Sequence, residues 1–411
     1  MSSDILRKKA EKLLKENKTH ARTGCLLLDL LIVGGEGLGI PWGTGLNLVG
    51  ISGSGKSALG NEIIAAEYHM GGNKKNLKWQ YEDCERGNRF STESLYGVDI
   101  FSNNVLEGVP DTVDELDARH SLFLDNLKKD DRGIYLLDSL DSLRDAERRE
   151  RQEKRKKAYK DGKDFKEGTY GLSATKFLSQ EFFRNQMGAV ADKKSIMIIM
   201  SQVRHNMDPM SFKKWVQAGG NALVHWMTTT VWFSRLSKIK RSNMDVGFLA
   251  KAKLEKSRHP RPFRECQFVF YYDHGVDNIG SCLDYLFDLR GKDGQLTKKQ
   301  HEISLKGVTK NISTYKELLE KHNLYEKAKE DKKADTGKAN LSVDWLDDWF
   351  AADDARKKLK IDFFGETLSR DELIEKAEND SKFAHEIEVM TIMKWEEFEE
   401  SIKTKRKGKY K

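Results

Sequence analysis

The chain has 411 residues, of which 72 are Lys or Arg and 65 are Asp or Glu, giving a formal net charge of +7. A domain usually takes about 100 to 200 residues, so we expect two or three units, and so modest a charge gives little support for nucleic-acid binding through an overall field. The four cysteines lack C-x-x-C spacing and a zinc-like histidine partner, which argues against disulfides and a structural metal. The charged N-terminus and the lack of an 18-residue apolar run argue against a signal peptide, a membrane span or a membrane partner, and favour the cytoplasm.

The N-terminal segment, residues 1–22, predicts a short amphipathic helix. Ile5, Leu6, Leu13 and Leu14 stand among lysines and glutamates at helical spacing. A helix of this kind has one apolar face, and that face needs a partner.

The largest unit, residues 23–288, predicts an α/β fold with a mostly parallel, twisted sheet flanked by helices. Between Leu46 and about Asp273, short apolar runs rich in strand-forming residues alternate with helical stretches, as in strands joined by crossover helices. The predicted strands are Leu46–Val49, Leu77–Tyr81, Ile134–Leu137, Ile196–Met200, Thr229–Phe233 and Gln267–Tyr272.

Past residue 288 the pattern loosens into a connecting segment, residues 289–340, and a C-terminal module, residues 341–411. Within the connection, Asn323–Asn340 is charged and nearly free of large apolar residues, as a linker is. The module predicts a small α-rich unit in which Ser369 and Glu372 form a capping box at the start of a helix. It contains Trp345, Trp349, Phe350, Phe363 and Phe364 and ends in the basic tail Lys403–Lys411.

The most informative motif fits the phosphate-binding pattern G-x-x-x-x-G-K-[ST], between the strand Leu46–Val49 and a predicted helix Ser57–His69. Its glycines let backbone N–H groups turn inward around phosphates, Lys56 brings a charge to the β and γ oxygens, and the Ser57 hydroxyl is a ligand for Mg²⁺. The helix N-terminus adds its dipole to the same anion site. The motif predicts a bound nucleoside triphosphate, with an idle surface loop as the alternative. The residues expected at the phosphates are Gly50, Ser52, Gly53, Ser54, Gly55, Lys56 and Ser57.

Two more of the predicted strands end in carboxylates. Ile134–Leu137 runs into Asp138, where a P-loop ATPase places the acid that orients Mg²⁺ and its waters; the alternative is an aspartate that caps the following turn. The strand that contains Trp79 runs into Glu82-Asp83-Cys84-Glu85. We expect one of these three acids to polarise the attacking water.

The order of these motifs resembles the RecA family of recombinases, from residue 23 to about residue 288. Thr23-Gly24 with Leu28-Asp29 looks like the family's opening segment, and Asp83-Cys84-Glu85 looks like its Asp-Ala-Glu, followed at the family's spacing by Gly97-Val98-Asp99. This resemblance makes Glu85 the catalytic base, in preference to Glu82 or Asp83. Asp138-Ser139 matches the Asp-Ser that ends the family's Walker B strand.

The segment after the predicted strand Ile196–Met200 resembles the part of the family that links nucleotide to DNA. Ser201-Gln202-Val203-Arg204 resembles Asn-Gln-Ile-Arg, so Gln202 inherits the role of γ-phosphate sensor, with a plain strand-end amide as the alternative. Gly219-Gly220-Asn221-Ala222-Leu223 repeats the family's Gly-Gly-Asn-Ala-Leu, so residues 205–218 correspond to its second DNA-binding loop. Cations suit phosphates and flat or soft side chains suit unstacked bases, although aromatics in a loop more often pack against their own domain. The expected DNA contacts are Arg204, Met207, Phe212, Lys213, Lys214, Trp215, Gly219 and Gly220.

Glu255-Lys256-Ser257-Arg258, upstream of Pro262-Phe263, is especially similar to the recombinases of T4-type bacteriophages, the UvsX branch. In RecA, two lysines at the matching places reach the γ-phosphate of the neighbouring subunit. The resemblance therefore implies that Lys256 and Arg258 act in trans on a neighbour's nucleotide. A solvated basic turn is the alternative.

Four features depart from the family's pattern. Thr92 stands where RecA proteins have an adenine-stacking tyrosine, and Phe90 is the candidate substitute, which leaves the preference for ATP open. The region of the first DNA loop, Arg144 to Lys166, is enlarged and densely charged, with a solvated helix and a DNA contact as equal alternatives. The family's N-terminal domain is reduced to the helix in residues 1–22, for which we expect docking on the adjacent subunit. The tail is basic, whereas recombinase tails are commonly acidic.

The resemblance predicts a DNA-dependent ATPase that forms filaments on single-stranded DNA and promotes pairing and strand exchange with homologous duplex DNA. Its expected cofactors are ATP and Mg²⁺, and its expected partners are further copies of the chain, a loader and a single-strand-binding protein. The expected location is the cytoplasm of a phage-infected bacterial cell. One alternative is a hexameric RecA-core helicase or DNA-packaging motor, and another is an accessory protein that binds DNA without exchanging strands. The presence of Glu85 and Gln202 counts against the accessory protein.

Overall fold

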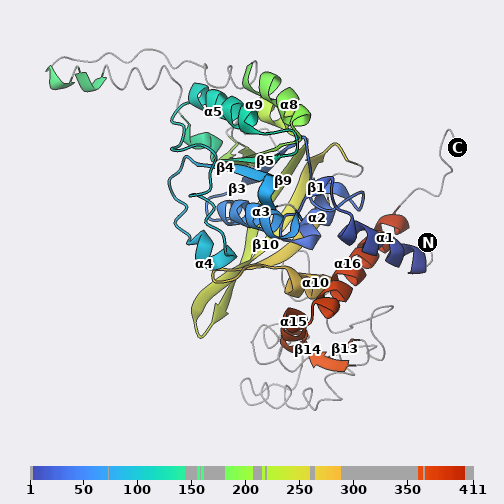
Figure 1. Cartoon of the computed structure of the whole chain (residues 1–411). Coiled ribbons are helices and arrows are strands. Elements are labelled where there is room, and N and C mark those ends of the chain that lie inside the picture. Colours follow the sequence, from blue (N-terminus) through green and yellow to red (C-terminus); the bar gives the residue numbers. More distant parts are fainter. Residues whose placement is uncertain are drawn as a thin grey trace.

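The computed structural model describes residues 3–72, 74–143, 155–157, 159–161, 181–206, 215–217, 220–259, 264–287, 360–363 and 366–402. Its centre is an eight-stranded sheet in the order β12-β11-β10-β9-β3-β6-β5-β4 (Figure 1). The five strands from β9 to β4 pair in parallel, and the strands from β9 to β12 pair antiparallel. The predicted α/β class with a mostly parallel sheet is confirmed. The strands are β3 (Thr44–Gly50), β4 (Leu77–Asp83), β5 (Arg132–Asp138), β6 (Ile196–Ser201), β9 (Thr229–Arg241), β10 (Met244–Ser257), β11 (Glu265–Tyr271) and β12 (Gly275–Asp277).

All six predicted strands belong to this sheet, whereas β10 was not predicted. The central strand β6 is buried along its whole length, as expected for a parallel strand covered on both faces. In β10 the alternation is present but faint, because Gly247 to Ala250 are buried without a break and two of the buried residues are the small alanines Ala250 and Ala252. A strand whose inward face is this small gives little signal in the sequence.

Helices cover both faces of the sheet, and alternate residues of each strand point to opposite faces. In β5, Ile134 and Leu136 belong to one apolar core, while Tyr135 and Leu137 belong to the other. The helices α2 (Leu26–Val33) and α3 (Lys56–Met70) contribute to the first core. The second core includes α5 (Val113–Asn126), α8 (Phe183–Asp192) and α9 (Gly220–Trp226), which lie together at the top of the view (Figure 1). Because β3, β4, β5 and β6 are parallel, their carboxyl ends meet at one edge of the sheet.

The predicted N-terminal helix is α1 (Ser3–Lys15), and it packs against α16 (Ser381–Ser401) of the same chain (Figure 1). Leu6 and Ala10 are buried in this contact zone. Arg7 and Lys9 each form a 2.6 Å ion pair with a glutamate of α16, Glu386 and Glu396 respectively. The apolar face of α1 thus has a partner within the chain. Docking of residues 1–22 on an adjacent subunit stays a prediction, and it requires a part of α1 that α16 leaves exposed.

The C-terminal region is α-rich where it is described, as predicted. It consists of β13 (Lys360–Phe363), β14 (Glu366–Ser369), α15 (Arg370–Asn379) and α16, and the helix expected after Ser369 is α15. Arg370 is partly buried and its Nε donates to Asp284 Oδ1 of α10 (Asn278–Leu286) at 2.7 Å, which joins this region to the core. Residues 289–340, the basic tail and four of the module's five named aromatic residues, Trp345, Trp349, Phe350 and Phe364, lie outside the described residues. Among the helices that are described, none has the length and apolar character needed to cross a membrane.

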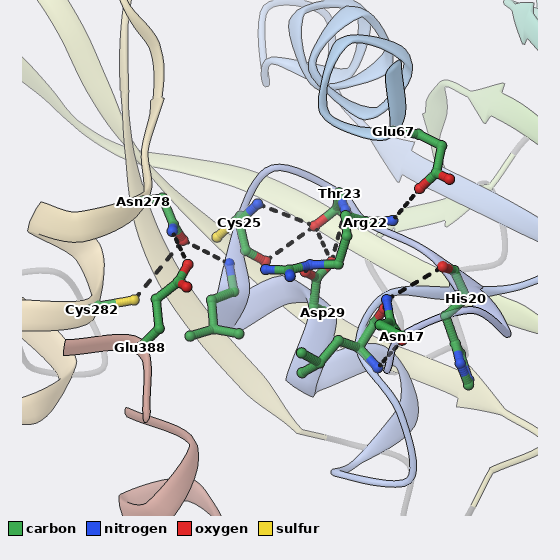
Figure 2. A network of polar contacts seen from close by, with 12 residues as sticks. Asn17, His20, Arg22, Thr23, Cys25, Asp29, Glu67, Asn278, Cys282 and Glu388 are labelled. Carbon is green, nitrogen blue, oxygen red and sulfur yellow. Dashed lines mark hydrogen bonds and ion pairs between the residues drawn. The ribbon is translucent and has the colours of Figure 1, made fainter. Parts of the chain in front are cut away.

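A buried polar network fixes the segment that opens the core (Figure 2). Asp29 Oδ2 accepts from Arg22 Nε at 2.6 Å, and its Oδ1 accepts from the Thr23 backbone and hydroxyl. The Arg22 backbone N–H donates to Glu67 of α3 at 3.1 Å, while Asn278 of α10 accepts from the backbone of α2. The short strand β1 (His20–Ala21) pairs with β2 (Ile40–Pro41) beside this network. The opening segment is thereby tied to the helix that follows the P-loop.

Glu62 of α3 gives the fold a pH dependence that a matched variant tests. Burial raises the pKa of Glu62 to about 7, although its carboxylate accepts from the Val276 backbone at 3.1 Å and from the hydroxyl of Tyr96 on α4 (Thr92–Tyr96). An unfolded glutamate titrates near 4.3, so the folded state binds more protons between about pH 4.3 and 7, and its stability falls as the pH rises through this window.

Glu62→Gln removes this titration and keeps an oxygen for the Val276 N–H. We expect the melting temperature of the variant, relative to wild type, to increase between pH 5 and pH 8, by about 2–4 °C for each kcal/mol recovered. Thermal denaturation of both proteins across this range measures the difference. A difference that is the same at pH 5 and pH 8 would mean that Glu62 ionises freely in the folded protein.

Candidate active site

The P-loop joins β3 to α3 at the carboxyl edge of the sheet. Gly53 and Gly55 have φ angles of 73° and 96°, in the left-handed region that glycine adopts without strain. A Cβ on Gly55 would also lie 2.7 Å from the Phe248 ring, so this position excludes any side chain. Gly55 supplies no side-chain cap to α3, so the first N–H groups of the helix are available to an anion.

Lys56 is the first residue of α3, and its ammonium folds back over the loop. The Nζ donates to the carbonyls of Gly50 at 2.9 Å and Ile51 at 3.0 Å. The side chain is mostly buried, and this burial lowers the pKa of Lys56, while the nearby carboxylates, Asp138 first among them, act in the opposite direction. A cation held in this way is placed to meet phosphate oxygens inside the loop.

A cavity of about 310 Å³ lies against the P-loop and gathers five of the predicted side chains. They come from elements far apart in the sequence, namely the start of α3, the segment after β4, the end of β5 and the segment after β6. Ser52, Gly53 and Gly55 of the loop also line the cavity. The five side chains are Lys56, Ser57, Glu85, Asp138 and Gln202.

Ser57 and Asp138 form an oxygen pair beside the phosphate loop. The Ser57 hydroxyl is hydrogen-bonded to the Asp138 carboxylate, and the Tyr81 hydroxyl donates to Asp138 Oδ2 at 3.0 Å. Burial raises the pKa of Asp138. Hydroxyl and carboxylate oxygens are the ligands that Mg²⁺ prefers, so the donor set fits this ion. The Ser57 contact comes from the P-loop helix and the Tyr81 contact comes from β4. Neither comes from the turn that follows β5.

The three acids at the carboxyl end of β4, Glu82, Asp83 and Glu85, have different surroundings, which bear on the choice of the base. Glu82 is buried and forms a bidentate pair with Arg119 at 2.8 and 3.0 Å, while also accepting from the Tyr135 hydroxyl. Asp83 accepts from the backbone N–H groups of the next turn. Of these acids, Glu85 is the one that lines the cavity as the structure describes it.

Glu85 is in direct contact with the predicted sensor. Gln202 Nε2 donates to Glu85 Oε1 at 2.8 Å, and Ser139 Oγ donates to the same oxygen at 2.5 Å. The backbone N–H of Gln202 donates in turn to Asp141 Oδ2 at 2.9 Å. Asp141 lies in the 3₁₀ turn Leu140–Ser142 and was not among the predicted residues, because no motif surrounds it.

An aromatic wall closes one side of the cavity, and sequence reasoning found only part of it. Thr92 is buried and accepts from the Ile100 backbone at 3.0 Å, so it does not occupy a base-stacking position, whereas Phe90 lines the cavity. Phe248 and Phe270, on β10 and β11, are stacked with centroids 5.3 Å apart and line it as well. These residues lie more than 150 positions from the P-loop, and β10 itself was not predicted. Arg235 and Tyr272 complete this side.

Lys256 and Arg258 lie at the C-terminal end of α9. The Lys256 ammonium donates to the carbonyls of Val224, His225 and Met227, and Arg258 donates to that of His225 at 3.4 Å. Cations at this end of a helix interact favourably with its dipole. Neither side chain belongs to the described lining of its own chain's cavity.

The predicted DNA loop is described only at its ends. The strands β7 (Val203–His205) and β8 (Trp215–Gln217) pair antiparallel, and α9 begins at Gly220. Trp215 is 46% exposed, and Arg204 forms a 3.1 Å ion pair with Asp141. The other predicted contacts, Met207, Phe212, Lys213, Lys214 and Gly219, lie outside the described residues, as does most of the charged insert 144–166.

Comparison with known proteins supports a relationship to the RecA family. The RecA N-terminal domain matches residues 156–277. RecA of Roseiflexus sp. (strain RS-1) is 25% identical over 263 residues, which cover 64% of this chain and 67% of that protein. RecA of Helicobacter pylori (strain G27) is 27% identical over 264 residues, covering 64% and 68%. The crystal structure of the RadB recombinase aligns with a TM-score of 0.41 and 18% identity, over 62% of this chain and 98% of that one. The similarity to the RecA proteins supports a role in recombination.

Proposed function

We propose that this chain is a DNA-dependent ATPase that forms filaments on single-stranded DNA and promotes homologous pairing and strand exchange. The observation that carries the proposal is the position of Gln202. Its side chain touches Glu85 in the nucleotide cavity, and the next residue begins β7, the first strand of the hairpin that leads into the predicted DNA loop. A nucleotide sensor and a DNA-contact segment are thus adjacent in the chain.

In the proposed hydrolysis, each side chain of the cavity has one task. The P-loop N–H groups and Lys56 hold the β and γ phosphates of ATP, and the Glu85 carboxylate takes the proton of the attacking water. Mg²⁺, held by Ser57 and Asp138, supplies charge neutralisation at the phosphates when it is bound. Gln202 exchanges its hydrogen bond to Glu85 for one to the γ-phosphate.

The aromatic wall suits a nucleobase. Aromatic faces stack favourably on flat rings, and Phe90, Phe248 and Tyr272 all border the same cavity as the phosphate loop. RecA proteins have a base-stacking tyrosine at the position of Thr92. We infer that Phe90 takes over this stacking role on adenine. Stacking of this kind is compatible with ATP, the proposed substrate.

The proposal places the nucleotide at an interface between subunits. Lys256 and Arg258, at the end of β10, contact the carbonyl end of α9 and are not part of the described lining of their own chain's cavity, which suits residues that act on a neighbour. Cations of this kind stabilise the phosphoryl-transfer transition state and make hydrolysis depend on assembly. The similarity of Glu255–Arg258 to the UvsX branch leads us to propose a T4-type phage origin. A loader and a single-strand-binding protein are its proposed helpers in the infected cell.

The segment 205–218 is proposed to contact single-stranded DNA, and its two kinds of side chain have separable signatures. Trp215→Ala should weaken single-strand binding by roughly 1–3 kcal/mol, as loss of a stacked base does. Lys213→Ala combined with Lys214→Ala should lower the slope of log affinity against log salt by about 0.7 for each DNA phosphate that is no longer neutralised. Fluorescence anisotropy over a salt series measures both. Unchanged affinity and slope, with wild-type melting and DNA-free ATPase, would remove this loop from the DNA interface.

The function itself is tested by ATP hydrolysis and DNA pairing in one preparation. We expect single-stranded DNA to stimulate hydrolysis and the protein to pair a labelled single strand with a homologous duplex. A non-homologous duplex of equal length is the control. Unwinding without pairing would indicate the helicase or motor, and DNA binding without pairing would indicate the accessory protein.

A further inference from the structure

Asp141 connects the nucleotide cavity to the hairpin that leads into the predicted DNA loop. One carboxylate oxygen, Oδ2, accepts from the Gln202 backbone N–H at 2.9 Å, and the other, Oδ1, accepts from the Arg204 guanidinium at 3.1 Å. The two partners are alternate residues of one extended segment. A single side chain therefore holds the predicted sensor and a predicted DNA contact together.

The turn that carries Asp141 is fixed to the hydrolytic residues. It begins two residues after Asp138, and its first residue, Leu140, is buried in the core that includes α5 and α8. Ser139, just before it, donates to Glu85. Asp141 thus has a defined position relative to the proposed base, and any backbone movement that accompanies the turn of Gln202 toward a γ-phosphate would change the distance between the Gln202 N–H and Asp141.

The other strand of the hairpin is anchored separately. Gln217 of β8 accepts from Asn47 Nδ2 at 3.3 Å, and Asn47 Oδ1 accepts from Ser201 Oγ at 2.8 Å. These contacts tie β8 to β3 and β6 without involving Asp141. Of the two strands, β7 is the one that contacts Asp141, through Arg204, while it also pairs with β8.

The exposure of Asp141 and Arg204 indicates which of the two contacts of Asp141 is easily exchanged. The side chain of Asp141 is 12% exposed, whereas that of Arg204 is 71% exposed. An ion pair with so exposed a guanidinium contributes little and is readily replaced by a DNA phosphate, while a hydrogen bond from a backbone N–H to a mostly buried carboxylate is costly to lose.

We propose that Asp141 is a positioning residue that couples the nucleotide site to DNA binding. It holds the backbone of Gln202 and withholds Arg204 from DNA until Gln202 turns to the γ-phosphate. This inference rests on the proposed function, and in particular on β7–β8 as a DNA-binding hairpin. It assigns a role to a residue that the family's motifs do not include.

Two substitutions separate the two contacts of Asp141. Asp141→Asn keeps an oxygen for the Gln202 N–H and removes the charge that holds Arg204, whereas Asp141→Ala removes both. Asp371→Asn is the matched control, because Asp371 is an exposed carboxylate beside an arginine, far along the chain on α15. Arg204→Ala, alone and combined with Asp141→Asn, tests whether the effect passes through Arg204.

The experiment measures the affinity for a fluorescent single-stranded oligonucleotide with and without a non-hydrolysable ATP analogue. We expect Asp141→Asn to bind DNA about two- to fivefold tighter than wild type without nucleotide and equally with it, so the enhancement by nucleotide falls by the same factor. By linkage, the enhancement of nucleotide affinity by DNA falls equally. Asp371→Asn should keep the wild-type enhancement, and in the Arg204→Ala background Asp141→Asn should have no effect.

The outcomes distinguish this inference from the proposed function. A wild-type enhancement that persists unchanged in Asp141→Asn overturns the role of Asp141 and leaves the proposed function intact. An increase in nucleotide-free affinity that persists in the Arg204→Ala background also overturns it, because the effect then bypasses the ion pair. A wild-type protein that shows no nucleotide-dependent binding of single-stranded DNA contradicts both proposals. If Asp141→Ala does not fold, the isosteric Asp141→Asn still decides.

Discussion

Glu85→Gln is expected to bind ATP with wild-type affinity and to hydrolyse it about 10²-fold more slowly, or worse, because a positioned base contributes at least this much. The amide keeps an oxygen for the hydrogen bonds that Gln202 and Ser139 donate, so the cavity should retain its shape. Lys56→Ala should instead abolish tight nucleotide binding, since it removes the charge at the phosphates. A fluorescent ATP analogue reports affinity, and a phosphate-release assay reports turnover.

Asp83→Asn is the matched control for the base, because Asp83 lies two residues away and contacts the backbone of its own turn. We expect its turnover to stay within a few-fold of wild type. Thermal denaturation checks that all three variants fold. A loss of about 10²-fold in Asp83→Asn, or an equal loss of nucleotide affinity in Glu85→Gln and Lys56→Ala, would contradict the assignment of Glu85.

Arg258→Ala is expected to lower DNA-stimulated hydrolysis by about 10³-fold or more, the contribution of an arginine supplied in trans. Arg258 is preferred to Lys256 for this test because the Lys256 ammonium holds three carbonyls at the end of α9, and its loss would also loosen that helix. Lys253→Ala, a surface cation on the same strand β10, is the control and should have nearly wild-type activity.

Mixing two inactive proteins tests action across the interface. In an equimolar mixture of Glu85→Gln and Arg258→Ala that assembles at random, about a quarter of the head-to-tail interfaces combine a wild-type base with a wild-type cation. Partial recovery of hydrolysis, greatest near equal proportions, is therefore expected. Absence of recovery at every ratio, with coassembly shown by crosslinking of labelled subunits, would place Arg258 outside the neighbour's site.

The parts of the site that were predicted from the sequence are those that local chain geometry determines. The P-loop pattern requires a strand before it and a helix after it, and Lys56 and Ser57 do lie at the start of α3, after β3. The choice among the three acids at the carboxyl end of β4 depends instead on side chains distant in sequence. Arg119 and Tyr135 donate hydrogen bonds to Glu82, and no sequence pattern near Glu82 predicts these contacts.

The features that were missed depend on contacts between distant segments. Asp141 reaches Gln202 across 61 positions through a backbone N–H, which leaves no trace in side-chain identity. The aromatic wall includes Phe248 of β10, a strand in which small buried residues weaken the apolar alternation of the sequence. The partner of α1 is α16, a helix about 380 residues away. Hydrophobic periodicity is a property of a single segment, so it predicts individual helices and strands more readily than the contacts between them.

Electron microscopy of the protein with single-stranded DNA and a non-hydrolysable ATP analogue is the decisive measurement for the proposed filament. We expect continuous helical filaments that need both ligands and that Lys56→Ala does not form. Closed rings, or particles the size of a single chain at concentrations that saturate both ligands, would contradict the proposed function.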